Sequence, residues 1–227
     1  MDRRFASILA VLFVVIIGLV VINKNSSNSS NGSKGNQSPV TNHTFGDNKK
    51  GVTLVEYGDY ECPICEAYYQ PLKQVTEQYK TDIHFQFRNL PLSSIHRNAF
   101  AAARASEAAA KQNKYWEMHD LLYENQSDWA ESTAPQTIFN GYAKQLGLNT
   151  DKFKQDYSSQ AVNDAINADI AAFNKTGQEM ATPTFFLNGR YLSNGNFSDP
   201  RTGQPSAEKI SAVIKAEIDK RNSDSKQ

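Results

Sequence analysis

Cysteine is scarce in this chain of 227 residues: only Cys62 and Cys65 are present, two residues apart. One pair excludes a disulfide framework of the kind that holds small secreted domains together. It also supplies at most half of the four ligands that a structural zinc site needs. Covalent haem attachment needs a histidine after the second cysteine, and Glu66 stands there instead. A purely structural bridge would close so short a loop that it would add only about 2 kcal/mol.

The chain has no excess of charge of either sign, with 24 Lys and Arg residues against 24 Asp and Glu residues. No basic stripe is present, which excludes nucleic acid as an expected partner. We find no internal repeat. The four histidines are scattered without ligand spacing, so no metal site is expected, and His96 and His119 are interpreted as packing or surface residues.

A long apolar run is present only near the N-terminus, where residues 5–22 carry no charge. This length approaches the roughly 20 residues of a membrane-spanning helix. A cleaved signal peptide, whose apolar core is usually about 7–15 residues long, is the alternative. Because Arg3 and Arg4 precede the run, the N-terminus is expected in the cytoplasm and the remainder outside the cell. The expected localisation is the cell membrane, with a single pass.

The expected domain organisation follows from these features. Residues 1–22 form the membrane anchor, residues 23–47 a flexible linker rich in Ser and Asn, residues 48–222 one globular domain, and residues 223–227 a tail. The globular domain is expected to be monomeric.

Hydrophobic periodicity predicts an α/β domain. Strands are expected at 52–57, 83–87 and 184–187, with a hairpin at Asn188-Gly189 leading into a strand at 190–192. Helices are expected at 63–79, 95–112, 115–123, 135–146, 151–157, 161–174 and 206–221. The order is βαβ, then a helical block, then ββα.

The cysteine pair lies where the first of these helices begins. Pro63 suits the first helical position, which makes Cys62 the N-cap, next to free backbone N–H groups and the positive end of the helix dipole. Such a site lowers the pKa of a thiol, and the thiolate is the nucleophile in thiol–disulfide exchange. We therefore expect Cys62 to attack or be attacked, and the more buried Cys65 to resolve mixed disulfides.

Glu56 lies within the first apolar strand. If it is buried, its pKa rises and it becomes a candidate proton carrier for Cys65. The residues alone equally allow a glutamate at the strand end that reaches solvent.

The segments GVTLVEYGDYECPIC and MATPTFFLNG, together with the element order, resemble the DsbA-like branch of the thioredoxin superfamily, including BdbD-type oxidoreductases. The resemblance implies a thioredoxin-like fold with a helical insertion at about 92–176. It implies that Cys62 and Cys65 are the redox pair, that Glu56 is a buried acid, and that Thr182 and a cis Pro183 bind substrate. It implies no cofactor. Expected partners are cysteine-containing secreted or surface proteins and a membrane reoxidase of the DsbB or VKOR type.

Two residues differ from strongly oxidising members of that family. The cysteines enclose Pro63 and Ile64, where those proteins carry Pro-His, and Thr182 is also typical of isomerases and reductases. The function we expect is that of an anchored extracytoplasmic thiol–disulfide oxidoreductase acting as a disulfide donor. The alternatives are a disulfide isomerase or reductase, and a redox-silent thioredoxin-like binding module.

Overall fold

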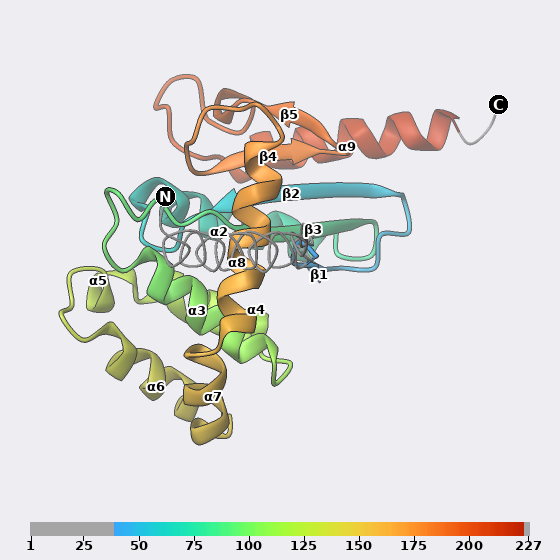
Figure 1. Cartoon of the computed structure of the whole chain (residues 1–227). Coiled ribbons are helices and arrows are strands. Elements are labelled where there is room, and N and C mark those ends of the chain that lie inside the picture. The colour runs from blue at the N-terminus through green and yellow to red at the C-terminus, as the bar shows by residue number, and fades with distance from the viewer. Residues whose placement is uncertain (1–38, 225–227) are drawn as a thin grey trace, which may run out of the picture. The chain divides into compact units, whose positions relative to one another are not determined.

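The computed structural model describes residues 39–224, which fold around one mixed sheet (Figure 1). The strand order is β1-β3-β2-β4-β5. The strands are β1 (His43–Phe45), β2 (Val52–Gly58), β3 (Ile83–Asn89), β4 (Thr184–Leu187) and β5 (Arg190–Leu192). β2 pairs in parallel with β3, and the other neighbours are antiparallel.

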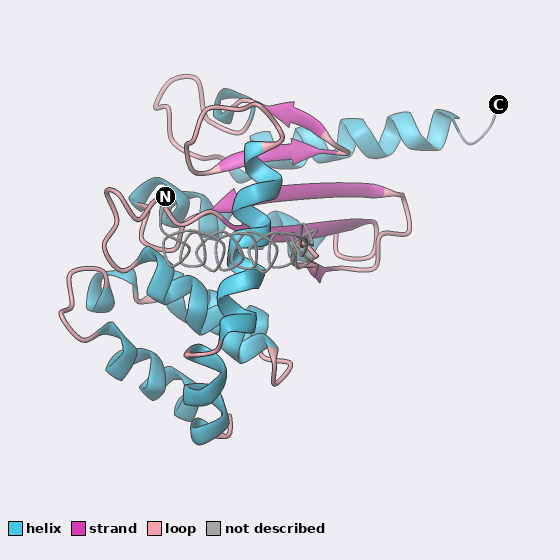
Figure 2. Cartoon of the chain, in the orientation of Figure 1, coloured by secondary structure: helices cyan, strands magenta, loops and turns pink. Residues whose placement is uncertain are grey.

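The described helices fall into two groups (Figure 2). The first group packs on the sheet and consists of α2 (Pro63–Gln78) and α9 (Ala207–Asp224), with the short 3-10 helix η1 (Asn194–Asn196) nearby. The second group is inserted between β3 and β4 and consists of α3 (Ala99–Ala110), α4 (Tyr115–Glu124), α5 (Gln126–Trp129), α6 (Pro135–Gln145), α7 (Thr150–Tyr157) and α8 (Gln160–Asn174). The expected thioredoxin-like fold with a helical insertion is present.

The alternation of side chains along the strands explains the main core. Leu54 of β2, Phe85 of β3 and Leu187 of β4 are neighbours in register, and they are buried beneath Leu72 of α2 and Ile214 of α9. β4 and β5 are joined by Asn188 and Gly189, whose φ angles of 48° and 79° belong to the left-handed region. A type I′ turn requires this conformation, so the expected hairpin is confirmed.

The inserted helices have their own core, and the alanine-rich helix α3 forms part of it. Ala102, Ala105, Ala108 and Ala109 are all fully buried. Their small side chains allow close packing of α3 against α4, α6, α7 and α8. Trp129 is fully buried in the same cluster.

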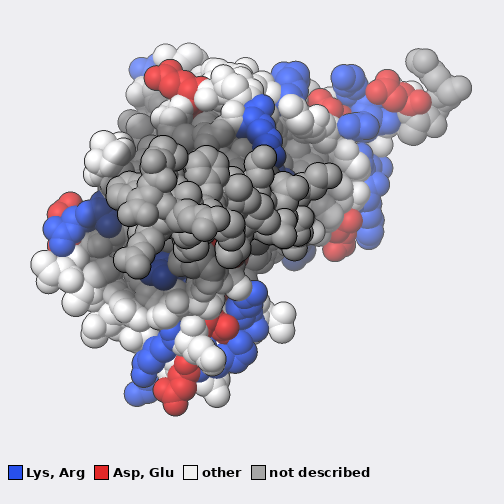
Figure 3. All heavy atoms as spheres, in the orientation of Figure 1, with Lys and Arg blue, Asp and Glu red and all other residues white. Residues whose placement is uncertain are grey.

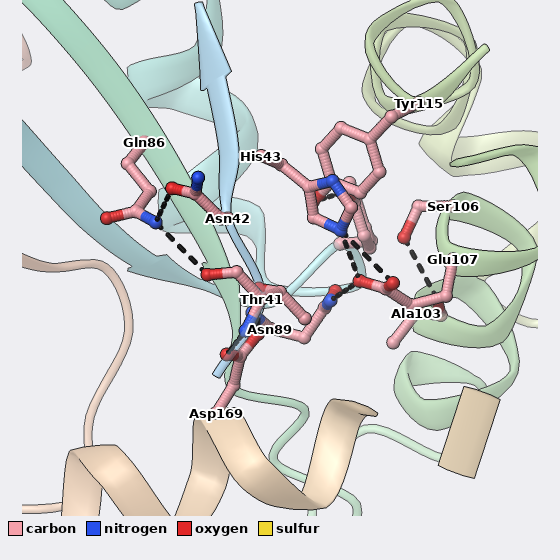
Figure 4. A network of polar contacts seen from close by, with 11 residues as sticks. Thr41, Asn42, His43, Gln86, Asn89, Ala103, Ser106, Glu107, Tyr115 and Asp169 are labelled. Atoms are coloured by element: carbon pink, nitrogen blue, oxygen red, sulfur yellow. Dashed lines mark hydrogen bonds and ion pairs between the residues drawn. The ribbon is translucent and has the colours of Figure 1, made fainter. Parts of the chain in front are cut away.

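The domain begins earlier than expected, because residues 41–47 are part of it rather than of the linker. β1 pairs with β3, and the buried Thr41 donates to Asp169 of α8 through its N–H at 2.8 Å and its hydroxyl at 2.6 Å. Asp169 also accepts the N–H of Asn89 at 3.0 Å (Figure 4). The predicted start of the domain at residue 48 was wrong. Thr41 lies 128 residues from its partner Asp169, and Asn89 lies 80 residues from the same carboxylate, so local sequence pattern does not reveal these contacts.

A second part of this network fixes His43 of β1. Its Nε2 lies 2.9 Å from the Glu107 carboxylate on α3, and its ring stacks on Tyr115 at a centroid distance of 3.5 Å (Figure 4). Asn89 donates to the same carboxylate at 2.7 Å. The N-terminal segment therefore ties the sheet to the inserted helices.

Helix α3 begins at Ala99 rather than at residue 95. The side chain of Asn98 donates to the carbonyl oxygens of Trp129, Ala130 and Ser132 at 2.8–3.0 Å. These contacts hold the preceding loop in a turn, which periodicity along one segment does not reveal.

The expected anchor at residues 1–22 lies outside the described residues. No helix within residues 39–224 is long and apolar enough to cross a membrane.

On the face drawn in Figure 3, Lys and Arg side chains alternate with Asp and Glu along α9. One such pair on this helix is Lys215 with Asp219.

We predict that Asp169→Ala lowers the free energy of unfolding by about 2–4 kcal/mol, because two buried backbone N–H groups lose their acceptor. Urea unfolding followed by circular dichroism measures the change. Asp164→Ala, a half-buried carboxylate on the same helix, is the control and should change stability by less than about 0.5 kcal/mol. Equal effects of the two substitutions would contradict the role of the Asp169 network.

Candidate active site

The two cysteines lie at the first turn of α2, as the sequence predicts. Cys62 is the N-cap in an extended conformation, and Pro63 follows at the first helical position. Cys65 is 1% exposed and Cys62 5% exposed, so Cys62 is the more accessible of the two thiols. Ile64, between them, is 55% exposed. Both cysteines are free thiols in this structure.

The two thiols have opposite acidities. The pKa of Cys62 is lowered to about 6, first by hydrogen bonding from the Cys65 thiol, then through Thr182 and the backbone N–H groups of Cys65 and Ile64. Neither N–H group makes a capping hydrogen bond of ordinary geometry, so their contribution is that of nearby dipoles. Burial raises the pKa of Cys65 well above its usual value. Near neutral pH, Cys62 is therefore the thiolate and Cys65 the thiol.

Glu56 is 3% exposed on β2, directly beside Phe87 of β3 and Phe185 of β4. Its burial, followed by the nearby Cys62 charge, raises its pKa to about 8. The interpretation as a strand-end glutamate in solvent is thereby excluded. Its neighbour Gly58 has no space for a side chain, since a Cβ there would lie 2.4 Å from the Phe87 ring. Because its pKa is raised to about 8, Glu56 can hold or release a proton within the core.

The Thr182–Pro183 peptide bond is cis, as the resemblance implies. The Thr182 carbonyl oxygen lies 3.6 Å from the Cys62 sulfur. The residues singled out in the sequence thus converge from three separate segments: β2, the start of α2, and the loop before β4.

Asp59, which was not among the residues singled out in the sequence, makes several contacts around the site. Its buried carboxylate accepts the N–H groups of Glu61 and Leu92, each at 2.8 Å, and lies 2.7 Å from His96 Nδ1. Its carbonyl oxygen accepts the Cys62 N–H at 3.1 Å. Asp59 therefore fixes the loop that carries Cys62.

The inserted helices hold the same loop. Gln126 of α5 donates to the carbonyl oxygens of Tyr60 at 2.7 Å and Cys62 at 3.2 Å, and Glu61 accepts the N–H of Asn98 at 2.6 Å. Gln126 and Asn98 carried no sequence signal, because each lies more than 35 residues from its partner.

Comparison with known proteins bears on the fold of this chain. A family model described as "Thioredoxin" matches residues 38–216. The Na(+)/H(+) antiporter NhaA 1 of Salinispora arenicola is 38% identical over 154 residues, which cover 67% of this chain and 22% of that protein. The chain thus spans less than a quarter of the length of this curated relative.

Two solved structures share the fold. Oxidised BdbD from Bacillus subtilis has a TM-score of 0.65 at 23% identity, over 78% of this chain and 93% of that one. α-DsbA1 from Wolbachia pipientis has a TM-score of 0.65 at 21% identity, over 81% of this chain and 94% of that one. The expected DsbA-like thioredoxin fold is confirmed.

We predict that the Cys62 thiol titrates near pH 6 and that Cys65→Ala raises its pKa, because the largest stabilising hydrogen bond is removed. Cys65→Ser is the matched variant, since its hydroxyl keeps the donor and should keep the pKa low. Thiolate absorbance against pH, or the rate of alkylation, measures all three proteins. A Cys62 pKa that is the same in the Ala and Ser variants would contradict this assignment.

We predict that Glu56→Gln stabilises the reduced protein at high pH but not at low pH. The folded pKa of Glu56, about 8, lies above its ordinary 4.5, so the stability it contributes is complete below pH 4.5 and is lost as pH rises through 8. The difference between variant and wild type should grow by on the order of 3 kcal/mol from pH 5 to pH 8. Urea unfolding across this range measures it.

The exposed Glu131 provides the control for this experiment. Glu131→Gln should follow the wild-type pH dependence. A constant difference between Glu56→Gln and wild type at every pH would show that Glu56 does not titrate in the core.

Proposed function

The chain belongs to the thioredoxin family, and on this premise we propose that it is a thiol–disulfide oxidoreductase that donates disulfides to other proteins. The observation that carries the proposal is the pairing of an acidic thiol at Cys62 with a buried, weakly acidic thiol at Cys65. A thiolate on one sulfur and a waiting thiol on the other is what stepwise disulfide exchange requires.

The reaction starts from a disulfide between Cys62 and Cys65. A substrate thiolate attacks the Cys62 sulfur, the bond to Cys65 breaks, and Cys65 leaves as a thiolate that takes a proton from Glu56. A second substrate thiolate then attacks the substrate sulfur in the mixed disulfide. The substrate gains a disulfide and Cys62 leaves as a thiolate, so two electrons have passed to the enzyme.

Two features support this direction. The lowered pKa of Cys62 stabilises the reduced enzyme, and a stabilised reduced form makes the disulfide more oxidising. Glu56, with its pKa near 8, holds a proton near neutral pH and can deliver it to the leaving Cys65 thiolate.

The Thr182 and Pro183 segment is the proposed substrate platform. Its carbonyl oxygen beside Cys62 can pair with the backbone of an extended substrate, as in strand addition to a sheet edge. Thr182 is buried beside Cys62 and helps to lower the pKa of that thiol. Cysteine-containing proteins in extended conformation are therefore the proposed substrate class.

We further propose that residues 1–22 anchor the enzyme in the cell membrane and that the redox site faces the extracytoplasmic side. The apolar run and the two preceding arginines support this arrangement. Reoxidation of the pair would require an electron acceptor, for which a membrane oxidase of the DsbB or VKOR type is the proposed partner.

A second candidate function is a disulfide isomerase or reductase, which Ile64 favours. The side chain of Ile64, which stands between the cysteines, has no donor with which to stabilise the Cys62 thiolate. The thiolate then depends on the Cys65 thiol, on Thr182 and on backbone N–H groups.

We predict that the wild-type protein oxidises a dithiol peptide when glutathione disulfide is supplied, and that Cys62→Ser abolishes this activity because the attacked sulfur is missing. We expect a reduction potential between about −120 mV, typical of DsbA, and about −270 mV, typical of thioredoxin. Equilibration with glutathione, followed by trapping of thiols, measures the potential.

The outcomes separate the candidates. A potential near −270 mV would exclude the donor function and leave the reductase. Equal inactivity of the wild type and of Cys62→Ser would exclude both and leave a redox-silent binding module.

A further inference from the structure

A pocket of about 60 Å³ lies next to Glu56, between the sheet and helices α2 and α4. Its wall includes Glu56 at the inner end, His119 of α4, and the partly exposed pair Lys73 and Asp120. A single water needs about 10–15 Å³, so the pocket has room for several. The pocket thus adjoins both the buried acid and the partly exposed pair, although the rest of its wall is mostly apolar and aromatic.

His119 is a residue of this pocket whose hydrogen bonding is incomplete. It is 4% exposed, and its Nε2 is buried without a hydrogen-bond partner among the described residues. Its Nδ1 lies 3.3 Å from Asp120 Oδ1. With Nδ1 donating to Asp120, Nε2 is left as a free acceptor. A buried nitrogen without a partner is costly, and water in the pocket can satisfy it.

The position of His119 connects it to Glu56. The His119 ring contacts the Phe87 ring edge-on at a centroid distance of 4.9 Å, and Phe87 is the direct neighbour of Glu56 across the sheet. Asp120, the neighbour of His119 on α4, is bound by Lys73 at 2.8 Å. His119 therefore lines the same pocket as the buried carboxyl and contacts the charged pair at the surface.

We propose that His119 relays protons between solvent and Glu56 through this pocket. This inference rests on the proposed function, because Glu56 must be reprotonated after each transfer to Cys65. A proton from solvent enters the pocket and is taken up by Nε2 of His119, while Nδ1–H keeps its contact with Asp120. Nε2 then passes this proton back to pocket water, which protonates the Glu56 carboxylate. The relay forms and breaks no bond between heavy atoms, so its balance is one proton gained by Glu56 and one lost by solvent.

The surroundings of His119 suit a neutral relay. Burial lowers its pKa, so the imidazole is uncharged near neutral pH and can accept and release a proton in turn. The other titratable groups that face the pocket or His119 are Tyr60 before α2, Tyr69, Lys73 and Glu77 on α2, Tyr115 and Tyr123 on α4, and His43 on β1. Burial raises the pKa of the four tyrosines, which leaves them poor proton carriers.

Packing alone is the competing explanation, because six aromatic rings surround His119, those of Tyr60, Tyr69, Phe87, Tyr115, Trp116 and Tyr123. Two substitutions separate the explanations. His119→Phe keeps an aromatic ring and removes both nitrogens. His119→Gln keeps a polar group that can bind water but cannot exchange protons as imidazole does.

The test measures turnover of the full chain with a dithiol peptide as reductant and glutathione disulfide as oxidant, from pH 6 to pH 8. We expect both His119 variants to slow turnover by about tenfold or more, with the loss greater at pH 8, where protons are scarce. The reduction potential and the Cys62 pKa should stay at their wild-type values, because a relay changes rates and not the end states. His84→Phe is the control, since the alternation of β3 places His84 on the opposite face of the sheet from Phe87.

A double-mutant cycle with Glu56→Gln completes the test. If His119 acts through Glu56, then His119→Phe should cause no further slowing in the Glu56→Gln protein. A wild-type rate in His119→Phe, restoration of the rate by His119→Gln, or equal slowing with and without Glu56 would each overturn the relay. A shifted reduction potential would also overturn it, in favour of packing. Wild-type protein without exchange activity would instead overturn the proposed function.

Discussion

The burial of Cys65 and Glu56 under the first turn of α2 is the constraint on which the site depends. Two groups that would be ionised or ionisable in water are kept nearly neutral by desolvation, while Cys62 at the helix N-terminus keeps its negative charge. This contrast gives the two sulfurs different roles. It also creates a problem, because a buried acid that gives up its proton needs a route by which to regain it.

The inserted helices also contact the site itself. α5 and the loop before α3 hold the backbone around Cys62, and α4 lines the pocket that opens from Glu56. The N-terminal segment joins these helices to the sheet through Thr41 and His43. The thioredoxin-like core and the insertion therefore form one functional unit.

Much of the fold could be predicted from local pattern. β2, α2 and the hairpin at Asn188-Gly189 follow from alternation, from the proline after Cys62, and from a turn that needs positive φ angles. The start of the domain could not be predicted in this way, because β1 is only three residues long and is held by partners far along the chain. The contacts of Asp59 could not be predicted either, since its partners Leu92 and His96 lie in a loop without a motif.

The sequence alone determined that one cysteine pair begins a helix after an apolar strand, and that a glutamate lies within that strand. These are properties of neighbouring residues, and helix capping and strand alternation act over a few positions. Only the tertiary structure decided that Glu56 is buried, that Thr182 reaches Cys62, and that His119 faces a pocket beside Glu56. Desolvation depends on what every other segment covers, so acidity and proton access are properties of the assembled core.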